Sequence, residues 1–291
     1  MFNFSFILSG IPQKTITREK LLEFIGDNTT KRINFAGSHV HALKKNEKGE
    51  GGKIKLPFND TIGPIIHEKV GKDLFSSQYG GFWRGLHSKE EYESFEEFVN
   101  EYKDIVFLRD HLDLSLALSM NFNEEDERTY IGELEYQAKF KNNEEAEAEL
   151  TGICNEWIEK FPFMKESDYI CAMPSSNGAT ESLPHRIVTG LEGFEFLDIS
   201  DSVSWKAKTR SVKDAATAEE KLVILEESGL QIAEGLDLKG KTVLLFDDLY
   251  MSGLSMQYVA MKLKEAGAAQ VFGLCIVKSR SNTTKLDDER Q

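Results

Sequence analysis

The C-terminal part of the chain alternates short apolar runs with segments of helical periodicity. The runs occupy residues 168–173, 194–199, 243–246 and 270–277. Their length and their polar or glycine boundaries are typical of buried strands. Apolar residues recur at helical spacing over 254–266, where Gly267 is placed to end a helix, and 218–235 is also predicted to be helical. This alternation predicts a parallel sheet with right-handed crossovers.

The pattern in the first 125 residues is mixed. Alternating phenylalanines over 2–8 predict a strand, and Thr17 is a predicted N-cap of a helix that reaches Gly26. The glycine- and lysine-rich segment 46–58 predicts an exposed hairpin turn or loop. A capping box of Ser88 and Glu91 opens an amphipathic helix predicted over 88–107. We therefore expect a mixed α/β region with a modest core of its own.

Two further helices are predicted over residues 128–161, on either side of a loop at 141–143. The acidic run 144–149 is most simply the solvated face of the second helix.

Composition limits the class of protein. With 291 residues the chain can form one large domain or two, and its 40% hydrophobic and 29% charged content is ordinary for a soluble protein. No run of eighteen apolar residues and no signal-peptide pattern is present, so no membrane association is expected. Three widely spaced cysteines argue against a disulfide framework, and a cytoplasmic location fits. A net charge of −14 makes general nucleic-acid binding unexpected, although a local basic pocket is not excluded.

Candidate chemistry is concentrated after the run 243–246. Asp247 and Asp248 follow this strand, and the small-residue loop Met251, Ser252, Gly253, Leu254, Ser255 leads into the next helix. Free N–H groups at a helix start suit a phosphate monoester, and paired carboxylates can accept hydrogen bonds from vicinal sugar hydroxyls. The alternative is an ordinary strand–helix turn with a solvated acid pair.

The stretch VLLFDDLYMSGLS resembles the phosphoribosyl-pyrophosphate (PRPP) motif of type I phosphoribosyltransferases, and Tyr250 is similar to the ComF-like branch of that family. The resemblance covers about 110 C-terminal residues, with a weaker match at Lys139-Phe140 upstream. It implies that Asp247 and Asp248 contact the ribose and that 251–255 wraps the 5′-phosphate. Met251 departs from the family pattern, because a small residue is usual there, and Leu254 is larger than the common alanine.

The resemblance also implies a pyrophosphate site. The loop after the run 168–173 would hold pyrophosphate through Ser175, Ser176, Asn177 and Gly178; a plain Pro/Gly turn is the alternative. The polar segment 201–214 would be a mobile lid that places basic residues on the pyrophosphate. These residues are Lys208 and Arg210, with Lys213 behind them, and the alternative is a solvated basic loop. Lys208, Arg210, Asp247 and Asp248 are the expected catalytic residues.

Two clusters in the N-terminal region have weaker interpretations. His39 and His41 would share one face if they lay in a strand, but such pairs are more often hydrogen-bonded than metal-bound. The aromatic and glycine-rich segment 78–84 could line a nucleotide pocket, or could be an aromatic core buried under a glycine turn, which is the commoner case.

The implied fold is α/β: a parallel-sheet type I phosphoribosyltransferase core over 126–280, an N-terminal mixed α/β hood or extra domain over 1–125, and a flexible tail over 281–291. The implied activity transfers ribose 5-phosphate from PRPP to an unidentified acceptor. Mg²⁺ would be the cofactor, held by PRPP and water, with Asp247 as a candidate contact and no direct protein cage. The alternatives are a non-catalytic PRPP or nucleotide sensor and a defence-type effector that acts through a protein or nucleic-acid partner. A protein partner or a homo-oligomer is left open.

Overall fold

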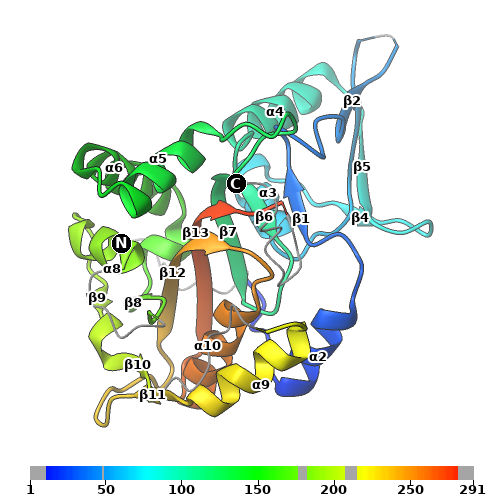
Figure 1. Ribbon diagram of the computed structural model, residues 1–291. Coiled ribbons are helices and arrows are strands. Elements are labelled where there is room, and N and C mark those ends of the chain that lie inside the picture. Colours follow the sequence, from blue (N-terminus) through cyan, green and yellow to red (C-terminus); the bar gives the residue numbers. More distant parts are fainter. Residues whose placement is uncertain (1–10, 48, 176–181, 207–214, 281–291) are drawn as a thin grey trace.

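The computed structural model describes residues 11–47, 49–175, 182–206 and 215–280. Within them, a seven-stranded sheet forms the centre, a four-stranded antiparallel sheet lies to one side, and helices pack around both (Figure 1). The α/β fold class with a mainly parallel sheet is therefore confirmed. The predicted strand over 2–8 and the predicted tail over 281–291 lie outside the described residues.

The large sheet combines strands from both halves of the chain. Its order is β1-β6-β7-β13-β12-β8-β9; the five strands from β7 to β9 are parallel, and β6 runs antiparallel to both of its neighbours, β7 and β1. The strands are β1 (Arg32–Asn34), β6 (Val106–Leu108), β7 (Leu114–Met120), β8 (Tyr169–Ala172), β9 (Leu197–Asp198), β12 (Thr242–Tyr250) and β13 (Gln270–Lys278). Three of these strands, β1, β6 and β7, come from the first 125 residues. They lie on one side of β13 and enlarge the sheet formed by the C-terminal strands.

Each face of the large sheet is covered by its own group of helices. Successive side chains of a strand point to opposite faces. Val243 and Leu245 accordingly pack with the helices α2 (Arg18–Gly26), α9 (Ala218–Ser228) and α10 (Leu254–Glu265). Leu244 and Phe246 belong to the core on the other face. That core includes α5 (Tyr130–Phe140), α6 (Glu144–Lys160), α7 (Pro162–Lys165) and α8 (Leu183–Gly190). Burial on both faces explains why these strands are apolar without alternation.

The smaller sheet has the order β2-β3-β5-β4. Its strands are β2 (Leu43–Lys45), β3 (Gly52–Leu56), β4 (Phe75–Ser76) and β5 (Phe82–Leu86), accompanied by helices α3 (Ile62–Val70) and α4 (Lys89–Glu101). Ile54 and Leu56 are buried from one face of β3 in the same core as the large sheet, whereas Lys53 and Lys55 alternate with them and are exposed. A short ribbon of β10 (Val203–Trp205) and β11 (Leu230–Ile232) follows the 3₁₀ turn η1 (Ser200–Ser202).

Several local predictions are confirmed by their hydrogen bonds. The Thr17 hydroxyl accepts from the N–H of Lys20 and caps α2. The Ser88 hydroxyl accepts from the N–H of Glu91 at the start of α4. The return bond of this capping box is different, because the Glu91 carboxylate accepts from His87 N–H and Arg84.

Four predicted elements have wrong boundaries. The helix predicted over 88–107 ends at Glu101, because the apolar residues that follow enter the large sheet as β6. The helix predicted over 218–235 ends at Ser228, where Gly229 with φ of 58° allows the turn into β11. Only Leu197–Asp198 of the run 194–199 pairs as a strand, since Phe194 and Phe196 stack on each other instead. The run 243–246 continues as strand to Tyr250.

Two N-terminal expectations are also corrected. His39 and His41 lie in a series of turns over 37–42 and not in a strand, so no shared strand face exists. The predicted hairpin segment 46–58 is a turn at its start, but Gly52–Leu56 forms the central strand β3.

The three cysteines are free and buried. Among the helices of the described residues, none combines the length and apolar character needed to cross a membrane.

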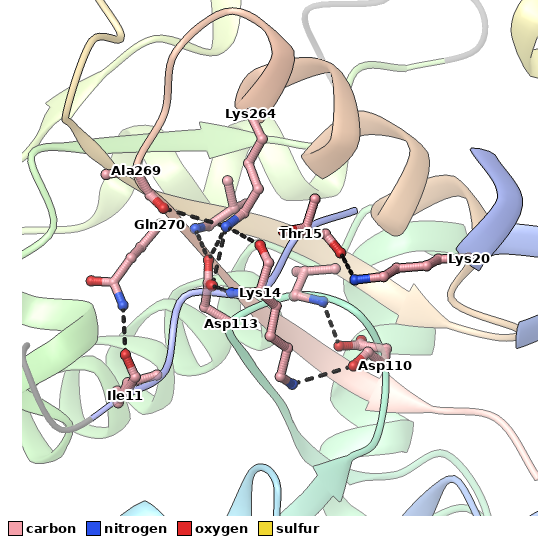
Figure 2. A network of polar contacts seen from close by, with 11 residues as sticks. Ile11, Lys14, Thr15, Lys20, Asp110, Asp113, Lys264, Ala269 and Gln270 are labelled. Atoms are coloured by element: carbon pink, nitrogen blue, oxygen red, sulfur yellow. Dashed lines mark hydrogen bonds and ion pairs between the residues drawn. The ribbon is translucent and has the colours of Figure 1, made fainter. Parts of the chain in front are cut away.

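A network of buried polar contacts fastens the segment 11–20 to the sheet (Figure 2). Asp113 is fully buried and lies 2.8 Å from Lys264 Nζ of α10. Its carboxylate also accepts from the backbone N–H groups of Lys14 and Val271. Gln270 donates from its side-chain amide to the carbonyl of Ile11. This one carboxylate therefore joins the N-terminal segment, β13 and α10.

Replacing Asp113 with alanine should destabilise the protein by about 3–5 kcal/mol, because Lys264 would keep a buried charge without its partner. Urea unfolding at neutral pH measures the change. The matched control is Glu265→Ala on the same helix, which removes the exposed pair with Lys262 and should cost less than about 1 kcal/mol. Equal losses for the two variants would contradict the central role given to Asp113.

Candidate phosphate and sugar site

The two loops predicted to bind phosphates lie at the same edge of the large sheet. β12 and β8 are parallel neighbours with Phe246 opposite Ala172, and Met173 N–H donates to the carbonyl of Phe246 at 2.7 Å. The loop that begins at Pro174 therefore starts beside Asp247. Ligands of open α/β sheets bind at this carboxyl edge of the strands.

β12 extends four residues beyond its last register pair with β8, from Asp247 to Tyr250. On its other side β12 stays paired with β13 as far as Tyr250. The predicted acid pair thus lies inside a strand, contrary to the prediction that it follows the strand's end. The result is a step in the sheet, about 13 Å long at the usual rise per residue, along which β12 has no β8 partner.

The two acids have different surroundings. The Asp248 carboxylate lies 2.8 Å from Lys139 Nζ of α5, and the same ammonium is 3.4 Å from Glu135. Asp247 lies opposite Cys275 on β13 and interacts electrostatically with Lys221 of α9. Adjacent strand residues point to opposite faces, which accounts for this division between α5 and α9. Both acids remain partly accessible to solvent.

Burial and mutual repulsion change the protonation of this group. Burial, followed by the negative charge of Asp248, raises the pKa of Asp247 to about 8. Burial also raises the pKa of Glu135. Burial opposes the charge on Lys139, but Asp248 and Glu135 outweigh it and raise the pKa of Lys139. At neutral pH the protonated form of Asp247 is therefore favoured, beside a second acid that is paired with Lys139.

The loop after β12 is short and is shaped by Tyr250. Gly253 has φ of 74°, and an added Cβ there would lie 2.0 Å from the Tyr250 hydroxyl oxygen, so a side chain cannot be accommodated. Tyr250 is buried and donates to the Asp110 carboxylate at 2.9 Å. The glycine predicted to let a phosphate approach is thus also required by the packing of the preceding strand.

The start of α10 retains polar groups for an anion. Helix α10 begins at Leu254, and its first intrahelical donor is the Gln257 N–H, which bonds to the Gly253 carbonyl. The N–H groups that precede Gln257 in the first turn of α10 have no acceptor within the helix, because no carbonyl lies four residues before them in the helix. Leu254 N–H approaches the Ser252 hydroxyl at 3.5 Å, and both Ser252 and Ser255 are partly exposed. This arrangement suits a phosphate group.

Residues after β8 and in the predicted lid are described only in part. Ser175 is partly exposed at the end of the loop that starts at Pro174. The other candidates in these two segments lie outside the described residues: Ser176, Asn177, Gly178, Lys208, Arg210 and Lys213.

The predicted lid over 201–214 is described only as far as residue 206. Residues 201–206 form the end of η1 and strand β10, which pairs with β11. The Trp205 indole donates to the Pro174 carbonyl at 3.0 Å and stacks on Tyr258 of α10 at 6.0 Å. These contacts hold Trp205 against the start of the loop after β8 and against α10, a packing role that the polar composition of the segment concealed.

Lys139, Glu135 and Lys221 are site residues that the sequence motif did not reveal. Glu135 and Lys139 are four residues apart on α5, a spacing that predicts a helical ion pair but not its position beside Asp248. The Lys139-Phe140 resemblance was the only available signal. In the described part of the chain, no group of three His, Cys, Asp or Glu side chains could hold a metal ion.

Comparisons with solved structures find phosphoribosyltransferases. One is a hypoxanthine phosphoribosyltransferase from Staphylococcus aureus, with 10% identity and a TM-score of 0.30, covering 47% of this chain and 65% of the enzyme. Another is a hypoxanthine-guanine phosphoribosyltransferase from Bacillus anthracis, with 14% identity and a TM-score of 0.30, covering 50% and 73%. This chain spans less than two thirds of the first enzyme. Likeness at this level carries no information about activity. No protein-family model and no curated protein matches the sequence.

The raised pKa of Asp247 predicts a pH-dependent stability. The folded protein binds the Asp247 proton more tightly than the unfolded chain does. The protonated side chain therefore stabilises the fold fully below pH 4, and this stabilisation is lost as pH rises through about 8. Asp247→Asn lacks this loss and should melt at a higher temperature than the wild type, with a larger difference at pH 9 than at pH 5. Thermal melts across that range measure it.

The control for this comparison is Asp104→Asn, which alters an exposed carboxyl group after α4. Its melting temperature should follow that of the wild type at every pH. A constant offset between Asp247→Asn and the wild type would contradict the assigned protonation.

Proposed function

We propose that this protein binds Mg²⁺-PRPP and transfers ribose 5-phosphate to an acceptor with release of pyrophosphate. The supporting observation is the step at the carboxyl edge of the sheet, where the acid pair, the loop after β8 and the start of α10 lie together. A sugar phosphate has hydroxyl groups at one end and a dianion at the other. At the step, the acid pair can accept hydrogen bonds from the hydroxyl groups, and the N–H groups at the start of α10 can donate to the dianion.

In this proposal Asp247 and Asp248 accept hydrogen bonds from the ribose hydroxyls. The backbone N–H groups of 251–255, with the hydroxyls of Ser252 and Ser255, bind the 5′-phosphate. Ser175 to Gly178 bind the pyrophosphate group, assisted by Lys208, Arg210 and Lys213. The acceptor's nucleophilic atom forms a bond to C1 as the bond from C1 to the pyrophosphate oxygen breaks, and the acceptor loses a proton. Neutralising the departing pyrophosphate is the main catalytic task.

Lys139 has a specific place in this scheme. It neutralises Asp248, and without it the unpaired Asp248 carboxylate would repel an anionic substrate. It also fixes the direction of the Asp248 carboxylate, whose side chain is 13% exposed. We assign it the role of a positioning residue.

Magnesium fits this site as an ion brought by the substrate. Asp248 is already paired and the protonated form of Asp247 is favoured, so the chain offers few free carboxylate ligands. Mg²⁺ keeps several waters and binds readily through phosphate oxygens. Asp247 would contact the ion or its water once deprotonated. Bound there, the ion would supply charge neutralisation for pyrophosphate.

The acceptor pocket is proposed to be built by the N-terminal region. Because β7 adjoins β13 and β6 adjoins β7 in the large sheet, this region is fixed beside the core. The aromatic segment 78–84 is a separate feature: Tyr79 is 89% exposed and Trp83 41% exposed, so the expected buried aromatic core does not form there.

Calorimetric titration with Mg²⁺-PRPP tests the binding proposal. We expect saturable heat for the wild type and a loss of affinity of roughly tenfold or more in Asp248→Asn, since hydrogen bonds to charged groups contribute about 1.5–3 kcal/mol. Glu133→Gln on α5 is the control, because that carboxylate pairs with Arg128 and not with Lys139. No heat with folded wild-type protein at millimolar ligand would end the proposal.

Turnover separates an enzyme from a sensor. Pyrophosphate release is measured across a panel of bases, amines and nucleotides. Release with at least one acceptor, abolished in Lys208→Ala, supports the enzyme. Binding without release, unchanged in Lys208→Ala but lost in Asp248→Asn, identifies a PRPP sensor instead.

A further inference from the structure

The open face of the four-stranded sheet has a composition unlike the rest of the molecule. One face of this sheet is buried: Gly52, Ile54 and Leu56 point toward α4 and the core, and a Cβ on Gly52 would meet the Tyr92 ring. The residues that alternate with them are exposed. Strand register places Lys44 opposite Lys53, and Lys55 opposite Trp83, which is in turn opposite Phe75. Directly opposite residues share a face, so these five side chains form one surface.

This surface belongs to a basic stretch of an acidic protein. Residues 43–86 contain eight Lys and Arg against five Asp and Glu, a net charge of +3, whereas the whole chain carries −14 and the remainder therefore −17. Lys44, Lys53 and Lys55 are exposed, and within the described residues none of them forms an ion pair. Like charges placed directly opposite each other, as Lys44 and Lys53 are, destabilise a sheet. An anionic partner would relieve that repulsion.

The surface is also aromatic. Among the described residues, three of the eight exposed large hydrophobic side chains belong to the β4–β5 hairpin: Phe75, Tyr79 and Trp83, exposed by 55%, 89% and 41%. Tyr79 lies in the turn of this hairpin, which extends away from the body of the molecule (Figure 1). Gly80 and Gly81 both have positive φ and allow that turn. Aromatic rings that are exposed to water contribute little to the stability of the fold, but they can stack on planar ligands.

A cavity of 890 Å³ adjoins the same surface. Tyr79, Trp83, Lys55 and Arg109 line it, together with the backbone and side chains of 28–30. The Arg109 side chain is 38% exposed, lies 3.8 Å from the Asp60 carboxylate and donates to the Thr29 hydroxyl at 2.9 Å. Arg109 follows β6 and precedes the start of β7, so this cavity lies at the edge where the parallel strands begin. The acid pair is at the opposite edge.

We propose that this face, defined as Lys44, Lys53, Lys55, Phe75, Tyr79, Trp83 and Arg109, binds single-stranded nucleic acid. Aromatic rings that stack on bases, interleaved with cations that track phosphates, are the chemistry by which proteins hold single strands. The surface crosses all four strands, about 14 Å at the usual strand spacing, which exceeds the size of one nucleotide. A duplex hides its bases from such rings, so a single strand is the partner that uses both features.

Fluorescence anisotropy with a labelled twelve-nucleotide dT strand tests this, using the full chain at 50 mM salt. We expect saturable binding, a loss of roughly tenfold in Trp83→Ala from the lost base stacking, and weaker binding to a duplex of the same length. Tyr130→Ala is the control, because this ring is 64% exposed on α5, outside the face. It should bind as the wild type does.

The salt dependence gives a second, independent measurement. Each phosphate contact contributes about 0.7 to the slope of log affinity against log salt for single strands. Lys53→Glu with Lys55→Glu should therefore lower the slope by about 1.4, whereas Lys165→Glu with Lys239→Glu changes net charge equally and should leave the slope unchanged. Circular dichroism establishes that each variant is folded.

Three results would overturn the proposal. The first is the absence of binding by the wild type at tens of micromolar protein. The second is equal affinity for single strand and duplex with no effect of Trp83→Ala, which indicates unspecific charge attraction. The third is displacement of the strand by UMP at a concentration equal to that of the strand, which indicates a mononucleotide pocket.

Discussion

The structure depends on the parallel pairing of β12 between β8 and β13. Two adjacent strands whose carboxyl ends are offset place the loop after β8 beside the acids of the longer strand. Val243 to Phe246 contribute the apolar part of this arrangement, since they are fully buried between two helical layers. Asp247 and Asp248, which follow Phe246, are partly open to solvent and can therefore serve a ligand, whereas Tyr250 returns to the core.

The C-terminal half was readable from sequence because its signals are local. The buried runs, the caps and the Gly267 stop each depend on a few neighbouring residues, and they predicted β8, β12, α10 and β13 in the correct order. What could not be read was how far β12 continues. Asp247 and Asp248 resemble a strand end in composition, but β13 keeps pairing with them, and a pairing partner is not visible in one segment.

The N-terminal half was less predictable because its elements join distant partners. In the sequence, Val106 to Leu108 continue the apolar spacing of a helix, yet they pair with β1 and β7. Lys139 gives the same lesson for the site: its spacing to Glu135 is a local helical signal, but its contact with Asp248 joins residues more than a hundred positions apart. The exposed rings of the β4–β5 hairpin are likewise indistinguishable in sequence from rings that form a core.

The contact between Tyr250 and Gly253 has a consequence for how this loop can vary. The ring of Tyr250 fills the volume that any side chain at 253 would need, and its hydroxyl is committed to Asp110. Met251 has no such restriction and is partly open to solvent. Within this five-residue loop, substitution at the first position should be tolerated in related chains, whereas the glycine at the third position should change only if Tyr250 changes with it.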